Sequence, residues 1–190
     1  GSDAGSITLD GTGSSGMGSL YGVWVFGTNS RVTTQAGDIS ITGRAGAGNG
    51  NDWYNIGVIV QQGGAVWSNG TGDITINGTG AFGGHHNPGV WIDGGVAVLS
   101  TSSGDISITG QGGGRAGFSQ GSIGVNVVNG GIVQSTGTGR ITVAGTGGVG
   151  ASSDYGVWVA DPNSRITSAT GDIAISGQGG TTAGQYDIGV

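Results

Sequence analysis

Three short apolar patches recur along this chain, and apolar and polar residues alternate within each. The first patch reads Ile-x-Ile, then a polar residue and glycine, as at residues 39–43 and 106–110. The second reads Gly-Val-x-Val, as at 22–25 and 57–60, and the third ends in serine or threonine, as at 32–34. Alternation with a period of two predicts β-strands that bury one face.

A glycine-anchored repeat spaces these patches along the chain. The anchor is Gly-Asp-Ile or a variant that keeps the glycine and the isoleucine. Successive anchors are 32, 35, 32, 35 and 32 residues apart, so the true period is a pair of unequal units, 67 residues long together. We therefore expect one domain, residues 1–190, built from coils that start near residues 5, 37, 72, 104, 139 and 171.

Turn-forming residues join the predicted strands. The second and third strands of a unit are separated by pairs such as Gly63-Gly64 and Gly130-Gly131, or by Asn29, all suited to positive φ. The Gly-rich segment between the first and second strands alternates between a shorter and a longer form. We expect each longer loop to spread over its shorter neighbour.

A single unit cannot bury its own apolar edges, but stacked units can. Parallel, in-register stacking places isoleucine on isoleucine and valine on valine in a continuous core. The predicted fold is all-β: a right-handed parallel β-helix (β-solenoid) with about three short strands per 32- or 35-residue coil. The first inward column would hold Ile7, Ile39, Ile74, Ile106, Ile141 and Ile173.

Composition agrees with this architecture. Glycine accounts for 48 of 190 residues, and the chain lacks Lys and Glu, two of the strongest surface helix formers. The absence of Cys excludes disulfides and thiolate metal sites. A net charge of −6 disfavours nucleic acid as a partner. The sequence contains no apolar run long enough to span a membrane as a helix.

The repeat resembles a known class of bacterial proteins. Residues 171–180 read Gly-Asp-Ile-Ala-Ile-Ser-Gly-Gln-Gly-Gly, and Gly-Val-x-Val with a Ser/Thr-rich return follows in complete units. This pattern is similar to the β-strand repeats of filamentous-haemagglutinin-type adhesins and autotransporter passengers. The resemblance implies export, an extracellular or cell-surface location, a long array in the parent protein and a role in adhesion. It carries over no catalytic residue.

Candidate chemistry is sparse. Asp38, Asp73, Asp105 and Asp172 share one repeat position, where stacked carboxylates either cap local N–H groups or bind calcium. We favour capping, and expect no other metal and no cofactor. The adjacent His85 and His86 are expected to be solvated in a loop. With no catalytic motif present, we expect no enzyme activity.

A column of tryptophans is the strongest candidate for a functional face. In the second strand, inward Val23 and Val25 leave Trp24 pointing outward, and the same alternation applies to Trp91 and Trp158. The three indoles recur at the 67-residue period, and would lie about 9.6 Å apart, which is two rung spacings.

Ile59 and Asn126 occupy the intervening positions of this column. A row of indoles can pack against a neighbouring rod or another partner, or stack on the sugar rings of a surface polysaccharide. Alternatively, each indole lies flat over Ile59 or Asn126 and only covers the sheet.

The leading functional hypothesis is a structural and adhesive repeat module of a bacterial cell-surface adhesin or extracellular fibre. The alternative is a carbohydrate-binding β-solenoid module, and the third is a polysaccharide-lyase-like enzyme. Because the sequence stops inside a second strand at Val190, we expect the segment to be part of a longer chain or filament.

Overall fold

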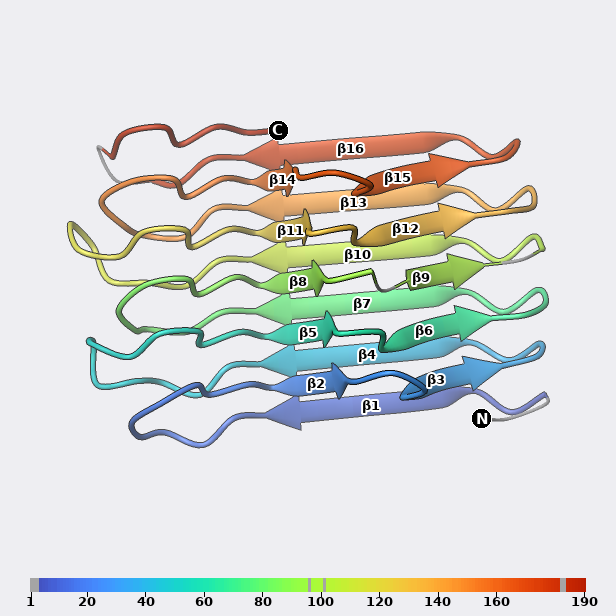
Figure 1. The fold of residues 1–190 in the computed structure, drawn as a ribbon, viewed down its shortest axis with the longest axis horizontal. Coiled ribbons are helices and arrows are strands. Elements are labelled where there is room, and N and C mark those ends of the chain that lie inside the picture. Colours follow the sequence, from blue (N-terminus) through green and yellow to red (C-terminus); the bar gives the residue numbers. More distant parts are fainter. Residues whose placement is uncertain (1–3, 96, 101, 182–183) are drawn as a thin grey trace.

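The chain forms a stack of coils, each built from three short strands (Figure 1). The computed structural model describes residues 4–95, 97–100, 102–181 and 184–190. All sixteen elements found in these residues are β-strands, arranged as three parallel sheets that share the direction of stacking. In the described part of the chain, no helix has the length and apolar character needed to cross a membrane.

Each sheet collects the same strand from successive coils. The first sheet contains β1 (Ile7–Thr12), β4 (Ile39–Arg44), β7 (Ile74–Thr79), β10 (Ile106–Gln111), β13 (Ile141–Thr146) and β16 (Ile173–Gln178). The second contains β2 (Val23–Phe26), β5 (Val58–Gln61), β8 (Val90–Asp93), β11 (Val125–Val128) and β14 (Val157–Val159). The third contains β3 (Arg31–Thr34), β6 (Ala65–Ser68), β9 (Ala97–Ser100), β12 (Ile132–Ser135) and β15 (Arg165–Ser168).

The register confirms the predicted stacking. Every pair of neighbouring strands in the described part of the chain is parallel and aligns equivalent repeat positions, as in Ile106 opposite Ile141 and Val58 opposite Val90. The all-β parallel solenoid expected from the sequence is therefore the fold of this chain. Its loops lie at one edge of the stack and the returns to the next first strand lie at the other (Figure 1).

The core lies between the three sheets and consists almost entirely of isoleucine and valine. Inward side chains such as Ile41, Ile76, Val60 and Val133 have no exposed surface. Burial of each such side chain contributes about 1.5–3 kcal/mol relative to leaving it exposed. The alternating pattern identified these positions because successive strand residues face opposite sides of the sheet.

A seam of glycines closes each coil where the first strand ends and the second begins. A Cβ at Gly110 would lie well under 3.0 Å from the carbonyl oxygen of Gly124, and one at Gly43 would meet Gly57 in the same way. Real Cβ atoms essentially never come so close to a backbone oxygen. Only glycine therefore allows this approach, which brings the first and second sheets together at the loop edge.

The turns and loops follow the predicted pattern. Asn29, Gly63 and Gly130 adopt φ values of 75°, 86° and 85° at the turn between the second and third strands. Long and short loops are hydrogen-bonded to each other, since the Ser119 hydroxyl donates to the Gly83 carbonyl at 2.9 Å. Each longer loop thus rests on its shorter neighbour.

The glycine seam gives a direct test of the fold. Gly110→Ala forces a methyl group against the Gly124 backbone, so we expect a loss of about 3 kcal/mol in the free energy of unfolding. Thr109→Ala changes the exposed neighbouring position of the same strand and serves as the matched control. Urea unfolding followed by circular dichroism measures both. Equal midpoints for the two variants would contradict the proposed close approach.

Candidate functional site

The predicted tryptophan column is present on the outer face of the second sheet. In register, Trp24 lies opposite Ile59, Ile59 opposite Trp91, Trp91 opposite Asn126, and Asn126 opposite Trp158. Trp24 is 49% exposed and Trp158 is 37% exposed. All three indoles project away from the Ile/Val core, as the alternation predicts.

The two intervening residues are buried although they also face outward. Ile59 is 1% exposed and Asn126 is 7% exposed. Each lies between two tryptophans on adjacent rungs, and loop side chains cover the column from the side. Covering of the sheet therefore accounts for part of the role of these indoles, most clearly at Ile59. Trp24 and Trp158 lie on β2 and β14, the edge strands of the sheet, so each has a neighbouring strand on one side only. Their greater exposure follows in part from this position, since the inward Val159 of β14 is also 40% exposed.

Tyrosines accompany the tryptophans, although the alternation of the strands does not predict them. The Tyr155 ring stacks on Trp158, with centroids 4.5 Å apart and an interplanar angle of 14°. Tyr21 contacts Trp24 edge-on at 5.2 Å. Both tyrosines precede their tryptophan by three residues, a spacing that could have identified them. Trp91 has Pro88 at that place and is instead contacted by Tyr54 of the preceding coil, at 5.7 Å.

A column of residues with left-handed backbone runs beside the aromatic column. Each member lies three residues before the glycine that opens the second strand. Their φ values are 68° at Tyr54, 55° at His86, 70° at Gly121, 60° at Ser153 and 62° at Tyr186. Non-glycine residues rarely adopt this conformation, and the strain costs on the order of 1 kcal/mol at each position.

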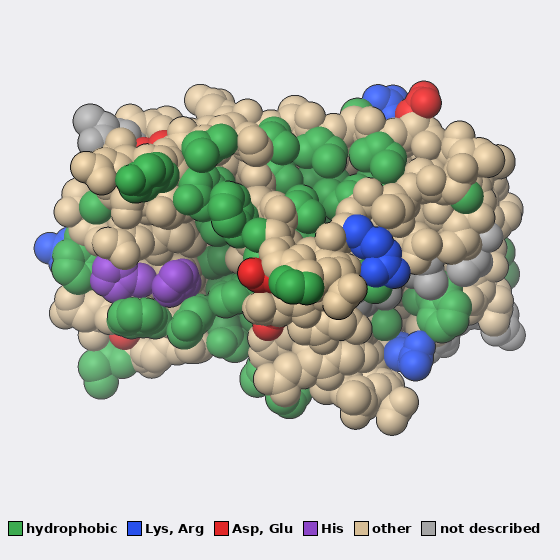
Figure 2. Space-filling model, turned by 45° about the horizontal axis from the view of Figure 1, so that its top comes forward, with side chains coloured by type: hydrophobic (Ala, Val, Ile, Leu, Met, Phe, Trp, Pro, Cys, Tyr) green, Lys and Arg blue, Asp and Glu red, His purple; other side chains and the backbone are tan. Residues whose placement is uncertain are grey.

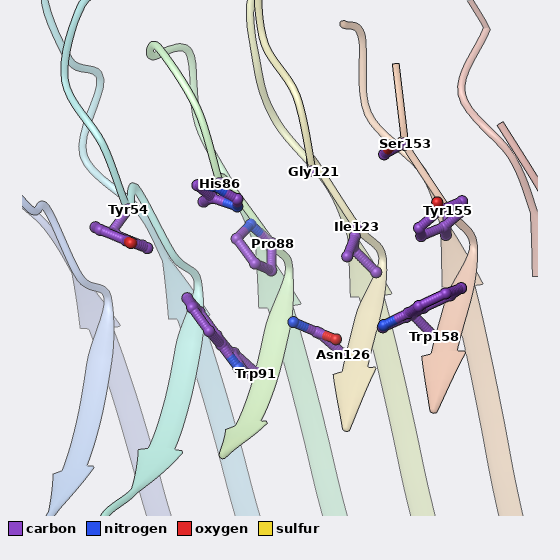
Figure 3. A pocket seen from close by; sticks show the side chains of 10 residues that line it. All are labelled: Tyr54, His86, Pro88, Trp91, Gly121, Ile123, Asn126, Ser153, Tyr155 and Trp158. Carbon is purple, nitrogen blue, oxygen red and sulfur yellow. The ribbon is translucent and has the colours of Figure 1, made fainter. Parts of the chain in front are cut away.

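A cavity of about 320 Å³ lies between Trp91 and Trp158 (Figure 3). Asn126 lies between the two indoles, and residues of the left-handed column form the side nearest the loops. Tyr54, His86, Pro88, Trp91, Gly121, Ile123, Asn126, Ser153, Tyr155 and Trp158 line the cavity. Figure 2 shows hydrophobic side chains beside the two histidines and around the hollow next to them.

Two buried polar atoms at this cavity have no hydrogen-bond partner. They are the side-chain oxygen Oδ1 of Asn126 and the indole nitrogen Nε1 of Trp91. An unpaired buried polar group costs about 1–3 kcal/mol. An acceptor and a donor are therefore buried beside the cavity without a partner.

The electrostatics of the cavity are nearly neutral. None of its lining residues is Asp, Glu, Lys or Arg. Burial lowers the pKa of His86 below its ordinary value, and the neighbouring His85 lowers it further. His86 is therefore mainly uncharged at neutral pH.

The expectation that His85 and His86 are solvated is wrong. Both are half-buried in an aromatic cluster that joins the loops to the cavity. His85 lies 4.9 Å from Trp53 and 5.0 Å from Phe118 between ring centroids, and His86 stacks with Tyr54 at 5.5 Å. These contacts could not be predicted from sequence neighbours, because the partners belong to the loops of the coils before and after that of the histidines.

The aspartate column forms hydrogen bonds between coils. The Asp73 N–H donates to Asp38 Oδ1 at 2.9 Å, the Asp105 N–H to Asp73 Oδ1 at 2.8 Å, and the Arg140 N–H to Asp105 Oδ1 at 2.7 Å. The carboxylates thus bind N–H groups of the next coil, a longer-range form of the expected capping. No cluster of three or more His, Cys, Asp or Glu suited to a metal ion occurs among the described residues.

These hydrogen bonds give a prediction about metal removal. Because the column already binds N–H groups, we expect the melting temperature to be the same with and without a calcium chelator. Differential scanning calorimetry before and after dialysis against chelator measures this. A large drop that added calcium reverses would show instead that Asp38, Asp73, Asp105 and Asp172 form a metal ladder.

A second polar column lies inside the loops and was not foreseen. The Asn55 N–H donates to Asn87 Oδ1 at 3.2 Å, the Ser122 N–H to Asp154 Oδ1 at 2.9 Å, and the Asp154 N–H to Asp187 Oδ1 at 3.0 Å. The repeat signal was visible, since every member lies two residues before the glycine that opens the second strand. The side-chain oxygens of this column accept hydrogen bonds from loop backbone N–H groups that lie outside the strand ladders.

Asp154 is the member whose environment opposes ionisation. Burial raises its pKa to about 6, partly offset by the Ser122 hydrogen bond and reinforced by the nearby Asp187 carboxylate. An aspartate whose folded pKa exceeds its unfolded value stabilises the fold below the unfolded pKa, near 3.8. That stability is lost as the pH rises through about 6.

Asp154→Asn should remove this pH dependence, because asparagine already serves at the equivalent positions 55 and 87. We expect the variant to be about 1–3 kcal/mol more stable than wild type at pH 7 and nearly equal to it at pH 4. Urea unfolding from pH 4 to 7 checks this, with the exposed Asp172→Asn as control. A constant stability difference across that range would contradict the raised pKa of Asp154.

Comparisons with protein-family models, with curated proteins and with solved structures found no match to this chain. The fold, a parallel β-solenoid, and the aromatic cavity are therefore the basis for any assignment of function.

Proposed function

We propose that this chain is a structural and adhesive repeat module of a bacterial cell-surface adhesin or extracellular fibre. The observation that carries the proposal is the exposed aromatic surface on a repetitive, regularly stacked scaffold. Trp53, Phe82 and Phe118, in the loops of interior coils, are 40–50% exposed, and Trp24 and Trp158, on the edge strands of the second sheet, are 49% and 37% exposed. Trp53 and Phe118 both contact His85, so their rings belong to one patch, and an exposed aromatic patch indicates a contact site.

The scaffold suits a role that depends on where its outward side chains lie rather than on their reactivity. The parallel hydrogen bonds between coils fix the spacing of outward side chains along the stack. The resemblance of the repeat to bacterial surface adhesins supports an extracellular location and neighbouring rods or surface polysaccharides as partners.

A carbohydrate-binding module is the second candidate, because the cavity between Trp91 and Trp158 combines aromatic walls with unpaired polar atoms. A polysaccharide-lyase-like enzyme has less support, since His86 is the one side chain in the lining that ordinarily titrates near neutral pH, and no carboxylate or Arg or Lys lies beside it there. We propose a binding role without catalysis.

The adhesive role predicts that the exposed indoles are needed for contact. We expect the double variant Trp24→Ser, Trp158→Ser to fold normally and to lose most of its surface attachment and self-association. Trp91 is retained because it helps to cover Ile59. Sedimentation velocity and retention on polysaccharide-coated surfaces measure the two properties.

Thr42→Ala, Thr109→Ala alters outward positions of the first sheet and is the matched control. It should attach and associate like wild type. If the double tryptophan variant also behaves like wild type in both measurements, the contact surface does not include this column, and the proposal for the aromatic face fails.

A further inference from the structure

The cavity between Trp91 and Trp158 exists because two columns are interrupted in neighbouring coils. Tyr54, His86 and Tyr186 fill the left-handed column with large side chains, but Gly121 and, in the next coil, Ser153 leave it open. In the tryptophan column the coil of Gly121 carries a small polar side chain, Asn126, where the coils on either side carry tryptophan. The opening is a local departure from the repeat.

The other gap in the tryptophan column serves as an internal comparison. Between Trp24 and Trp91 the chain has Ile59, which is 1% exposed, and Tyr54 fills the left-handed position of that coil. Two equivalent gaps therefore differ: one is closed by apolar side chains, and the other is open with a polar floor.

The walls of the open gap suit a single ring. Trp91 and Trp158 rise from strands two rungs apart, about 9.6 Å, and Asn126 lies between them (Figure 3). Carbon atoms in contact are about 3.5–4.0 Å apart. The spacing of the two strands therefore leaves room for one ring and not for two stacked rings.

The floor of the gap favours a ligand that also forms hydrogen bonds. Asn126 is 7% exposed, and its Oδ1 atom has no partner, while the Nε1 atom of Trp91 is buried and also unpaired. An occupant that satisfies both atoms offers a donor and an acceptor at its rim and apolar surface on its faces. A pyranose ring has this character, because C–H groups cover its faces and hydroxyl groups surround its edge.

The charge of the site favours a neutral ligand. Its lining contains no Asp, Glu, Lys or Arg, and the chain carries a net charge of −6. The carboxylate of an acidic sugar or the phosphate of a nucleotide would have no cationic partner there. The volume of about 320 Å³ is at the lower end of the range of about 300–1,000 Å³ for small-ligand sites.

We propose that the cavity between Trp91 and Trp158 binds one neutral pyranose ring of a saccharide, with Asn126 as its hydrogen-bonding residue. The inference deepens the proposed adhesive function, on which it rests for its biological setting. The ligand is a neutral saccharide ring, the site is the gap at Asn126, and the gap at Ile59 binds no ligand.

The test uses neutral trisaccharides of glucose, galactose or mannose as probes. Titration is followed by the indole N–H resonances in two-dimensional NMR spectra. We expect shifts at Trp91 and Trp158 and none at Trp24 or Trp67, with a dissociation constant on the order of 1 mM for at least one probe.

Two variants close the gap with residues that the chain uses at equivalent positions. Asn126→Ile copies Ile59, and Ser153→Tyr copies Tyr54 and Tyr186. Each should unfold at or above the wild-type temperature and weaken saccharide binding at least about tenfold. Thr109→Ala, on the outer face of the first sheet and away from the cavity, is the matched control and should bind within about twofold of wild type.

Three results would overturn the inference. They are no shift with any neutral probe, a preference for acidic saccharides or an aromatic peptide, and undiminished binding by both gap-closing variants. If one of these results is obtained and the Trp24→Ser, Trp158→Ser variant still loses attachment, the adhesive proposal stands without the saccharide site. If saccharide binds but the double tryptophan variant attaches like wild type, the adhesive proposal fails and the saccharide site stands.

Discussion

Parallel hydrogen bonding between equivalent strands is the interaction on which the rest of this structure depends. It sets a rung spacing of about 4.8 Å, so that any residue type repeated along the sequence becomes a column in space. Isoleucine and valine columns form the core. The glycine seam, in which Gly110 meets Gly124, lets the coil close tightly enough for all three sheets to share that core.

The same stacking decides how the loops are stabilised. Loop backbone cannot reach the sheet hydrogen bonds, and unpaired buried N–H groups are costly. Two polar columns supply acceptors: exposed aspartates such as Asp73, and the buried series that includes Asn87 and Asp154. Asp154 shows the limit of this arrangement, since burial opposes its ionisation. The hydrogen bonds that stabilise the loops therefore require the same rung spacing as those between the strands.

The sequence predicted the fold well because the information is local and repeated. The pattern Ile106-Ser107-Ile108 shows which side chains face inward, and its recurrence shows what stacks on it. The outward direction of Trp24 and Trp158 followed from the same argument. The partners of these indoles were harder to predict, because Tyr54 reaches Trp91 from another coil through a left-handed backbone that no local signal marks. Asn126 was known as an intervening residue, but its unpaired oxygen becomes visible only once both neighbours are in place.

The central claim is that the register places Asn126 between Trp91 and Trp158, so that a departure from the repeat becomes a polar-floored aromatic cavity. Nuclear Overhauser contacts in the free protein test this placement most directly. The account predicts cross-peaks from the Asn126 side-chain amide protons to ring protons of both Trp91 and Trp158. Cross-peaks to one indole alone, or to Trp24, would contradict the register and the cavity that follows from it.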